Sequence, residues 1–157
     1  MLEIPDNYYS NLSSYEEFVI KTNLLGYEIS KQIVLDSLCK VEDYYFLVIN
    51  RHLCFLDNKG NKAENVVIKG DFICSYNQLT SLEGCPKEVD GNFDCYGNQL
   101  TSLEGCPEKI GGSFCCYGNK LTSLKGCPKE VDGNFNCSNN SRKLSKPNNL
   151  KCKNFYN

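Results

Sequence analysis

The second half of the chain alternates apolar and polar residues in a pattern that returns every 21 residues. Full copies run over residues 70–90, 91–111 and 112–132, and a fourth copy begins at Gly133 and loses the pattern after Asn140. In each copy a Val or Ile precedes a Phe by four residues and a Cys follows it by two, as in Val89, Phe93 and Cys95. This alternation has the period of a β-strand, so it predicts one short strand per copy with Phe and Cys facing inward. A unit of this length cannot bury its own apolar side, and we therefore expect the copies to stack as coils of a solenoid whose strands pair in parallel.

The remainder of each copy predicts where the coil turns. An Asn follows each strand, and stacked amide side chains can satisfy backbone groups at a turn. Two Leu then return the chain to the core, a Gly permits a tight bend, and a Pro cannot donate a ladder hydrogen bond. We expect a loop or 3₁₀ turn on this convex side. The Asn positions are Asn77, Asn98, Asn119 and Asn140, and the prolines are Pro86, Pro107 and Pro128.

The shared frame Phe-x-Cys-x-x-Asn-x-Leu resembles the core of a leucine-rich repeat, Leu-x-Leu-x-x-Asn-x-Leu, with Phe and Cys in two Leu places. The short period and the Leu-Thr-Ser-Leu-x-Gly-Cys-Pro tail are similar to bacterial or phage-type short repeats. The resemblance covers about residues 66–140. It implies an arc-shaped solenoid that binds a partner, usually a protein, on its concave strand face. The chain departs from common members of the family in being very short and rich in Cys.

Residues 1–65 do not share the repeat, and we expect an α+β unit there. Residues 13–25 have a helix-start signal followed by an apolar stripe, while residues 29–40 fit either a second helix or a strand. Residues 43–50 are rich in aromatic and β-branched side chains and predict a strand, with residues 53–56 as its hairpin partner. This unit is either a cap that covers the first coil or a separate recognition module. The predicted architecture is therefore α+β: an N-terminal unit over 1–65, a solenoid over 66–140 and a basic cap or tail over 141–157.

Composition narrows the choice of compartment and chemistry. A net charge of −2 predicts neither nucleic-acid nor acidic-membrane binding, and the sequence has no signal peptide and no run of apolar residues that could span a bilayer. We expect a soluble, cytoplasmic protein. Seven of the eleven cysteines occupy repeat positions, where Cys serves as a small buried apolar residue, so we expect reduced thiols. A metal site is the alternative, but the chain has no Cys-x-x-Cys pair and a single His; we expect no cofactor.

Outward-facing strand positions are where binding can vary without disturbing the frame, and they line up as columns on successive coils. Tyr96 and Tyr117 are the best anchors, because Tyr offers a large contact area and a hydroxyl group; the alternative is that both pack locally in a Cys-Tyr-Gly-Asn turn. Cys115 lies outside the inward columns, yet no His or basic residue is predicted beside it to activate the thiol. The predicted partner-binding residues are Asp71, Ile73, Asn92, Asp94, Tyr96, Ser113, Cys115, Tyr117 and Asn136.

These features predict a protein-binding module rather than an enzyme, acting as an inhibitor or adaptor, as a monomer or small homo-oligomer. The size and style of the chain resemble those of accessory proteins of phages and mobile elements. One specific form of the protein-binding hypothesis is therefore that it blocks a host-defence complex such as a CRISPR nuclease. The alternative is nucleic-acid binding through the tail, which has five basic residues and no acidic one. The tail residues that could contact phosphates are Arg142, Lys143, Lys146, Lys151 and Lys153. A third hypothesis, an enzyme with Cys115 as nucleophile, would require a reactive thiol.

Overall fold

The computed structural model describes residues 35–157 except 42–43, 50, 58 and 60–61. The helix predicted over residues 13–25 lies outside the described residues. The described part begins with an antiparallel sheet of three strands in the order β1-β2-β3. The strands are β1 (Leu35–Val41), β2 (Tyr44–Ile49) and β3 (His52–Asp57). The predicted strand over 43–50 and its hairpin are confirmed, and the ambiguous segment is a strand from Leu35 onward.

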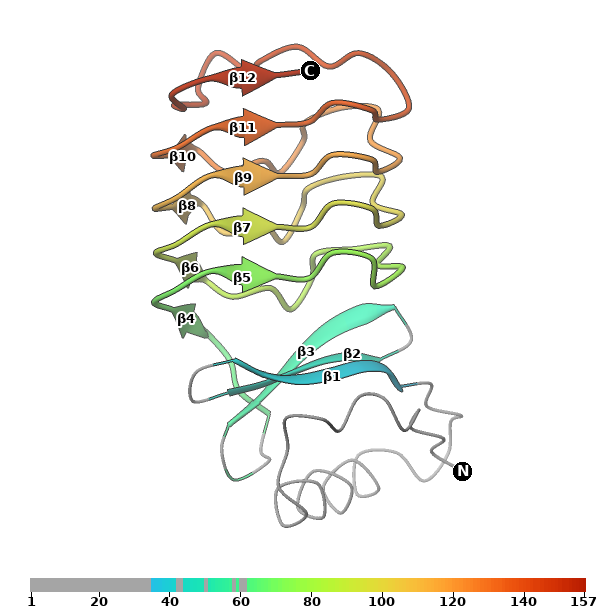
Figure 1. The fold of residues 1–157 in the computed structure, drawn as a ribbon, viewed down its shortest axis with the longest axis vertical. Helices are drawn as coiled ribbons and strands as arrows, with labels where there is room; N and C mark the ends of the chain where they lie inside the picture. Colours follow the sequence, from blue (N-terminus) through green and yellow to red (C-terminus); the bar gives the residue numbers. More distant parts are fainter. Residues whose placement is uncertain (1–34, 42–43, 50, 58, 60–61) are drawn as a thin grey trace.

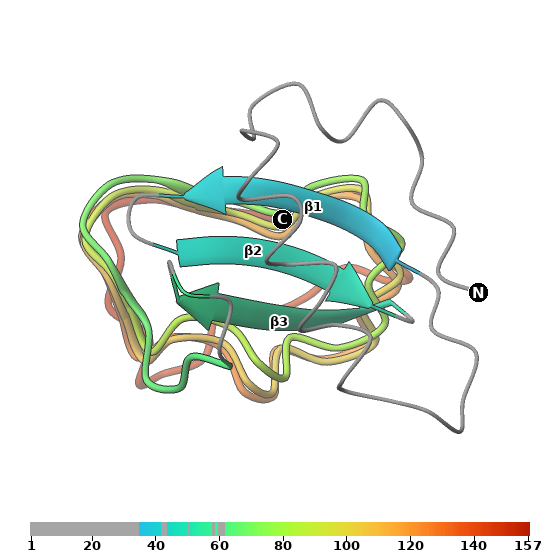
Figure 2. The same ribbon diagram turned by 90° about the horizontal axis from the view of Figure 1, so that it is seen from below.

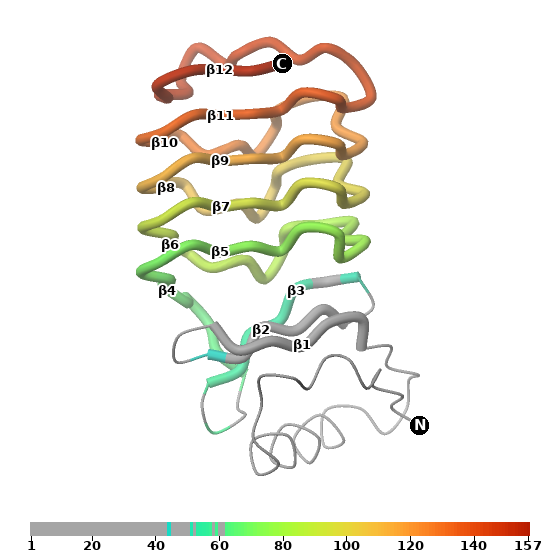
Figure 3. Tube along the Cα trace, viewed as in Figure 1, coloured from blue at the N-terminus to red at the C-terminus, as the bar shows by residue number. Residues whose placement is uncertain are grey.

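The repeats form the predicted parallel solenoid, with one coil per 21-residue copy (Figure 1). The Cα trace shows each coil following the path of the one before it (Figure 3). One parallel sheet has the order β10-β8-β6-β4 and the other β12-β11-β9-β7-β5. The strands of the first sheet are β4 (Val67–Ile68), β6 (Glu88–Val89), β8 (Lys109–Ile110) and β10 (Glu130–Val131). Those of the second are β5 (Phe72–Ile73), β7 (Phe93–Asp94), β9 (Phe114–Cys115), β11 (Phe135–Asn136) and β12 (Phe155–Tyr156).

The single strand predicted across Val-x-Gly-x-Phe-x-Cys is wrong, because each coil has two short strands separated by a corner at the Gly. Adjacent coils approach very closely there: a Cβ added to Gly91 would lie 2.6 Å from the carbonyl carbon of Gly70. Period-two alternation is the same on both sides of such a corner, so the pattern alone cannot reveal the bend. The coils also stack along a nearly straight axis in Figure 1, whereas the family resemblance implied an arc.

The core consists of side-chain columns that run through every coil. The Phe rings contact their neighbours with centroid separations of 5.0 to 5.5 Å, and the Phe and Cys positions predicted to face inward are buried. The two ends extend the same column, because β3 supplies a ring below the first coil and β12 supplies one above the last. The stacked rings are Phe55, Phe72, Phe93, Phe114, Phe135 and Phe155.

Both ends of the stack are covered in the described structure. At the first coil, the backbone of β3 lies so close that a Cβ on Gly84 would be 2.4 Å from the carbonyl oxygen of Leu53, and Figure 2 shows the three-stranded sheet lying across this end. At the last coil, Leu144 and Leu150 are buried, and the Asn157 amide bonds with the backbone of Leu144. Residues 141–157 therefore cover the last coil, and Tyr156 in this segment is half exposed.

The Asn residues form the predicted ladder along the turn after the second sheet. The Oδ1 atom of Asn98 accepts hydrogen bonds from the backbone N–H groups of Asn77 (2.9 Å) and Leu79 (3.0 Å). Its Nδ2 atom donates to the carbonyl oxygens of Cys74 (3.0 Å) and Cys95 (2.9 Å). One buried side chain thus joins two coils and satisfies four backbone groups.

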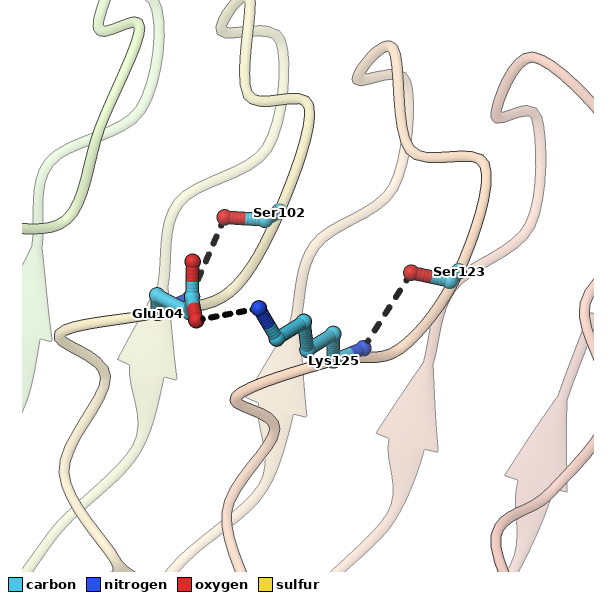
Figure 4. A network of polar contacts seen from close by, with 4 residues as sticks. All are labelled: Ser102, Glu104, Ser123 and Lys125. Carbon is cyan, nitrogen blue, oxygen red and sulfur yellow. Dashed lines mark hydrogen bonds and ion pairs between the residues drawn. The ribbon is translucent and has the colours of Figure 1, made fainter.

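The side of the coil that holds the prolines is a chain of turns, as predicted, and no strand or 3₁₀ turn is formed there in the repeats. The N–H of Cys106 donates to the carbonyl of Leu103 (3.0 Å) across a bend whose third residue, Gly105, has φ +89°. Ser102 Oγ accepts the N–H of Glu104, and the Glu104 carboxylate pairs with Lys125 of the next coil at 2.9 Å (Figure 4). Polar side chains therefore tie neighbouring coils together on this side too. The described chain has no helix that is long and apolar enough to cross a membrane.

Candidate functional site

The outward surface of the five-stranded sheet carries most of the residues predicted to bind a partner. We call it the strand face and define it by the outward residue of each strand and the tyrosines that follow the strands. Among residues 62–157, every large apolar side chain that is exposed lies on it. These side chains are Ile73 (63% exposed), Tyr76 (71%), Tyr117 (41%) and Tyr156 (49%). The register sets Ile73, Asp94, Cys115, Asn136 and Tyr156 in one column.

The outward column of Asp71, Asn92, Ser113 and Asn134 serves the corner between the two sheets. Asp71 Oδ1 accepts the N–H of Asn92 (2.7 Å), Asn92 Oδ1 accepts the N–H of Ser113 (2.8 Å), and Ser113 Oγ accepts the N–H of Asn134 (3.0 Å). Each side chain therefore satisfies a backbone donor one coil away. Their oxygens therefore already hold the coils together, and a role of these residues in partner binding stays a prediction.

Asp94 and Asn136, the acidic and amide members of the column that begins at Ile73, fix the turn that follows their own strand. Asp94 Oδ1 accepts the N–H of Tyr96 (3.1 Å) and the hydroxyl of Ser75 (2.9 Å). Asn136 Oδ1 accepts the N–H and the hydroxyl of Ser138 in the same way (3.1 and 2.8 Å). Both side chains thus form turns that set the direction of the residues beyond the strand.

Cys115 occupies the same column with a thiol that is not activated. Burial raises its pKa, a backbone hydrogen bond at Tyr117 opposes that effect in part, and the nearby Asp94 carboxylate raises the pKa further. A thiolate is the nucleophilic form of Cys, so a raised pKa lowers its reactivity near neutral pH. This local chemistry argues against the third hypothesis, a Cys115 nucleophile.

The predicted tyrosine anchors combine local packing with exposure. The rings of Tyr96 and Tyr76 meet edge to face with centroids 4.6 Å apart. Burial, Tyr76 and the Asp94 carboxylate all raise the pKa of Tyr96. One coil further on, the Tyr117 hydroxyl accepts a hydrogen bond from the Asn139 amide at 3.3 Å. Tyr96 and Tyr117 thus both make local contacts, and Tyr117 also presents exposed surface; that they anchor a partner stays a prediction.

Tyr76 is the residue on this face that sequence reasoning missed. It has φ +57° in a position that Gly97, Gly118 and Asn139 occupy in the other coils, all with positive φ. The left-handed region is unfavourable for a bulky residue. A Cβ on Gly97 would lie 2.4 Å from the Tyr76 ring, so that ring lies directly over the Gly of the next coil. An aromatic residue in the column where the repeat otherwise has Gly or Asn was the signal.

The remaining thiols are part of the core. All ten cysteines that the structure describes are free thiols, and burial raises the pKa of Cys95, Cys116 and Cys137, to about 11 for Cys137. Neighbouring thiols in the stack, such as Cys74 and Cys116 around Cys95, raise the pKa further. Within the described residues, no three His, Cys, Asp or Glu side chains are grouped so that they could hold a metal ion.

The basic residues predicted as phosphate contacts lie on the final coil. The backbone of that coil continues the ladder, because the N–H groups of Lys151 and Lys153 donate to the carbonyls of Lys129 (2.9 Å) and Gly133 (2.8 Å). The side chains themselves are exposed to solvent. The structure therefore spreads these charges over the covered end of the stack and does not bring them to the strand face. The residues are Arg142, Lys143, Lys146, Lys151 and Lys153.

The chain is thus a parallel β-solenoid of 21-residue coils with one face on which exposed aromatic and aliphatic side chains collect. Comparisons with protein-family models, with curated proteins and with solved structures gave no match to this chain.

Proposed function

We propose that the chain is a leucine-rich-repeat-like, non-enzymatic module that binds a partner protein on the strand face. The observation that carries the proposal is the segregation of exposed apolar side chains. Among residues 62–157, Ile73, Tyr76, Tyr117 and Tyr156 are the large apolar side chains left exposed, and all belong to this one face. Exposed apolar surface collected in one place marks an interaction site more often than scattered exposure does.

The design of the coil supports a rigid docking surface. Backbone groups on both sides of the strand face are held by side-chain ladders, through Asp71 and Asn92 at the corner and through Asn98 and Asn119 at the following turn. Side chains on such a frame lose little freedom when a partner binds, which lowers the cost of association. Tyrosines are enriched in interface hot spots for this reason and for their combined apolar and polar contacts.

A module of this kind acts by occupying a surface of its partner, as an inhibitor or an adaptor does. The version in which a phage or mobile-element protein blocks a host-defence complex belongs to this class. The proposal requires only that the strand face be covered in the complex.

The proposal is tested by affinity capture from a cell lysate, with and without nuclease, using the full chain and two variants. The double variant I73S/Y117S removes exposed apolar surface from the strand face. The matched control E88A/K109A changes two exposed side chains on the other sheet. We expect one protein complex to be retained after nuclease treatment, kept by the control and lost by the strand-face variant. Equal capture by both variants would refute the strand face as the docking surface, and loss of all prey with nuclease would shift the function to the basic final coil.

A further inference from the structure

One corner of the strand face combines aromatic rings with a carboxylate that can accept further hydrogen bonds. Asp94 accepts two hydrogen bonds from Ser75 and Tyr96, and both go to Oδ1. No described residue donates to its Oδ2 atom. The paired rings of Tyr76 and Tyr96 stand beside it, and Tyr76 is 71% exposed. The Tyr96 backbone N–H donates to this carboxylate at 3.1 Å, so Asp94 and Tyr96 lie close together.

The charges of this corner are not balanced within the described chain. On the other faces, acidic side chains pair with lysines one coil away, as Asp90 does with Lys69 (3.0 Å) and Glu108 with Lys129 (2.9 Å). Among the described residues, no Lys or Arg lies within ion-pair distance of Asp94 or of Asp71, the other carboxylate at this end of the face. The corner is therefore negative, apolar and aromatic, and it complements a cation that also has a flat or extended apolar part.

We propose that the corner formed by Tyr76, Tyr96 and Asp94 receives an arginine side chain of the partner protein. This inference rests on the proposed function and specifies the chemistry of the partner's anchor. A guanidinium group is planar, so it can stack on a tyrosine ring while one edge donates hydrogen bonds to a carboxylate. An ammonium group is a more strongly hydrated point charge and stacks less well, which favours arginine over lysine.

The geometry of the turn explains how the corner is built. The positive φ of Tyr76 and the absence of a side chain at Gly97 let the Tyr76 ring cross to the next coil, where it meets Tyr96. The hydrogen bond from the Tyr96 N–H to Asp94 Oδ1 fixes the carboxylate and leaves Oδ2 as an acceptor. The next two coils have Gly97 and Gly118 at the position that Tyr76 occupies, so the corner exists at one position on the face.

The inference is tested with the short peptide acetyl-Gly-Arg-Gly-Arg-Gly-amide and a control peptide in which citrulline replaces both arginines. Citrulline keeps the shape of the side chain and removes its charge. We expect the arginine peptide to shift the NMR signals of Tyr76, Tyr96 and Asp94 in a saturable way, and 0.5 M salt to weaken the effect because the Debye length then falls to a few ångströms. Equal shifts with the citrulline peptide, or shifts confined to other faces, would overturn the inference.

Two variants complete the test. D94N keeps the Oδ1 acceptor that the turn needs and removes the charge, and Y76N places at this position the residue that the fourth coil has at Asn139. We expect each to weaken binding of the arginine peptide by about fivefold. Unchanged binding by both variants would overturn the inference even if one of them were poorly folded.

The outcome is separable from that of the proposed function. If partner capture is lost by I73S/Y117S but kept by D94N and Y76N, the strand face binds its partner without an arginine anchor. If capture is unaffected by all of these changes, the strand face is not the docking surface, whatever the peptide experiment shows.

Discussion

Replacing Asn98 with Ala should destabilise the solenoid more than any single change to an exposed side chain. The Asn98 side chain is buried, and its amide satisfies the N–H groups of Asn77 and Leu79 and the carbonyls of Cys74 and Cys95. Ala removes all four bonds, but the Cys95 carbonyl still accepts a hydrogen bond from the Asn119 amide. An unsatisfied buried polar group costs about 1–3 kcal/mol, so even the lower bound for the other three groups gives a loss of about 3 kcal/mol in the free energy of unfolding. That is a large share of the roughly 5–15 kcal/mol that stabilises a typical domain.

Asn140 provides a matched control within the same ladder. Its amide makes equivalent bonds to the N–H of Leu121 and the carbonyls of Cys116 and Cys137, but the side chain is only partly buried. Water can replace the lost bonds there, so Asn140→Ala should cost about 1 kcal/mol. Urea denaturation followed by far-UV circular dichroism gives both values. If Asn98→Ala cost no more than Asn140→Ala, the reasoning that burial makes the ladder essential would be refuted.

The variant Asn98→Asp tests the donor half of the same network. Asp keeps an acceptor for the two N–H groups but sets a second oxygen against the carbonyls of Cys74 and Cys95. We expect burial and these oxygens to raise the pKa of the new carboxyl group. The unfolded chain then loses its proton first, so the stability of the variant should fall as pH rises above about 4. The gap to the wild type, measured by urea denaturation, should be wider at pH 7 than at pH 4; a constant gap would contradict the assignment of Nδ2 as the donor.

The other predictions concern the thiols, the turns and the surface ion pairs. Because burial raises the pKa of Cys137 from 9.0 to about 11, the unfolded chain deprotonates first. Between pH 9 and 11 this thiol should cost about 1.4 kcal/mol of stability per pH unit, and urea midpoints of Cys137→Ala should fall less steeply with pH than those of the wild type. Gly105→Ala should lower the free energy of unfolding by more than about 2 kcal/mol, since φ is +89° and the new Cβ would lie 2.7 Å from backbone atoms of the previous coil. At Gly118 the nearest atom is 3.8 Å away, so Gly118→Ala should show only the roughly 1 kcal/mol cost of its positive φ. Equal losses for the two variants in denaturation would show that the close approach does not matter. Lys125→Ala breaks an exposed ion pair with Glu104 and should change stability by less than about 1 kcal/mol, with the difference vanishing at high salt.

The elements fixed by packing could be predicted from the sequence, because the residues that repeat in every copy are the ones that pack in the core. The inward Phe and Cys positions, the Asn ladder and the hairpin ending at Asp57 follow from periodicity and residue type. The corner at Gly91 could not be found in this way, since alternation continues through it and the close approach of Gly70 appears only once the coils are stacked.

The candidate site was predicted only in part, because outward position does not distinguish a free side chain from one that holds the next coil. Asp71 and Asn92 were expected to be available for binding, but their oxygens accept backbone N–H groups 21 residues away. Ile73 and Tyr117 are exposed, as a binding residue should be. Tyr76 was missed because its importance depends on where its ring lies over Gly97, which no local pattern specifies.

Near-identical coils present a register problem that the core cannot solve. Since each coil offers the same Phe, Cys and Leu columns, a pairing that skipped one coil would bury the same apolar groups. The exposed positions on the first sheet differ in charge instead: Lys87 and Lys129 are separated by Glu108, and Glu88 and Glu130 are separated by Lys109. The native register pairs opposite charges, as in the contact of Lys129 with Glu108, whereas a skipped coil would set like charges against each other. Each exposed pair is worth less than about 1 kcal/mol, but several act together, so the variable surface of this face specifies the order of coils that the repeated core holds together.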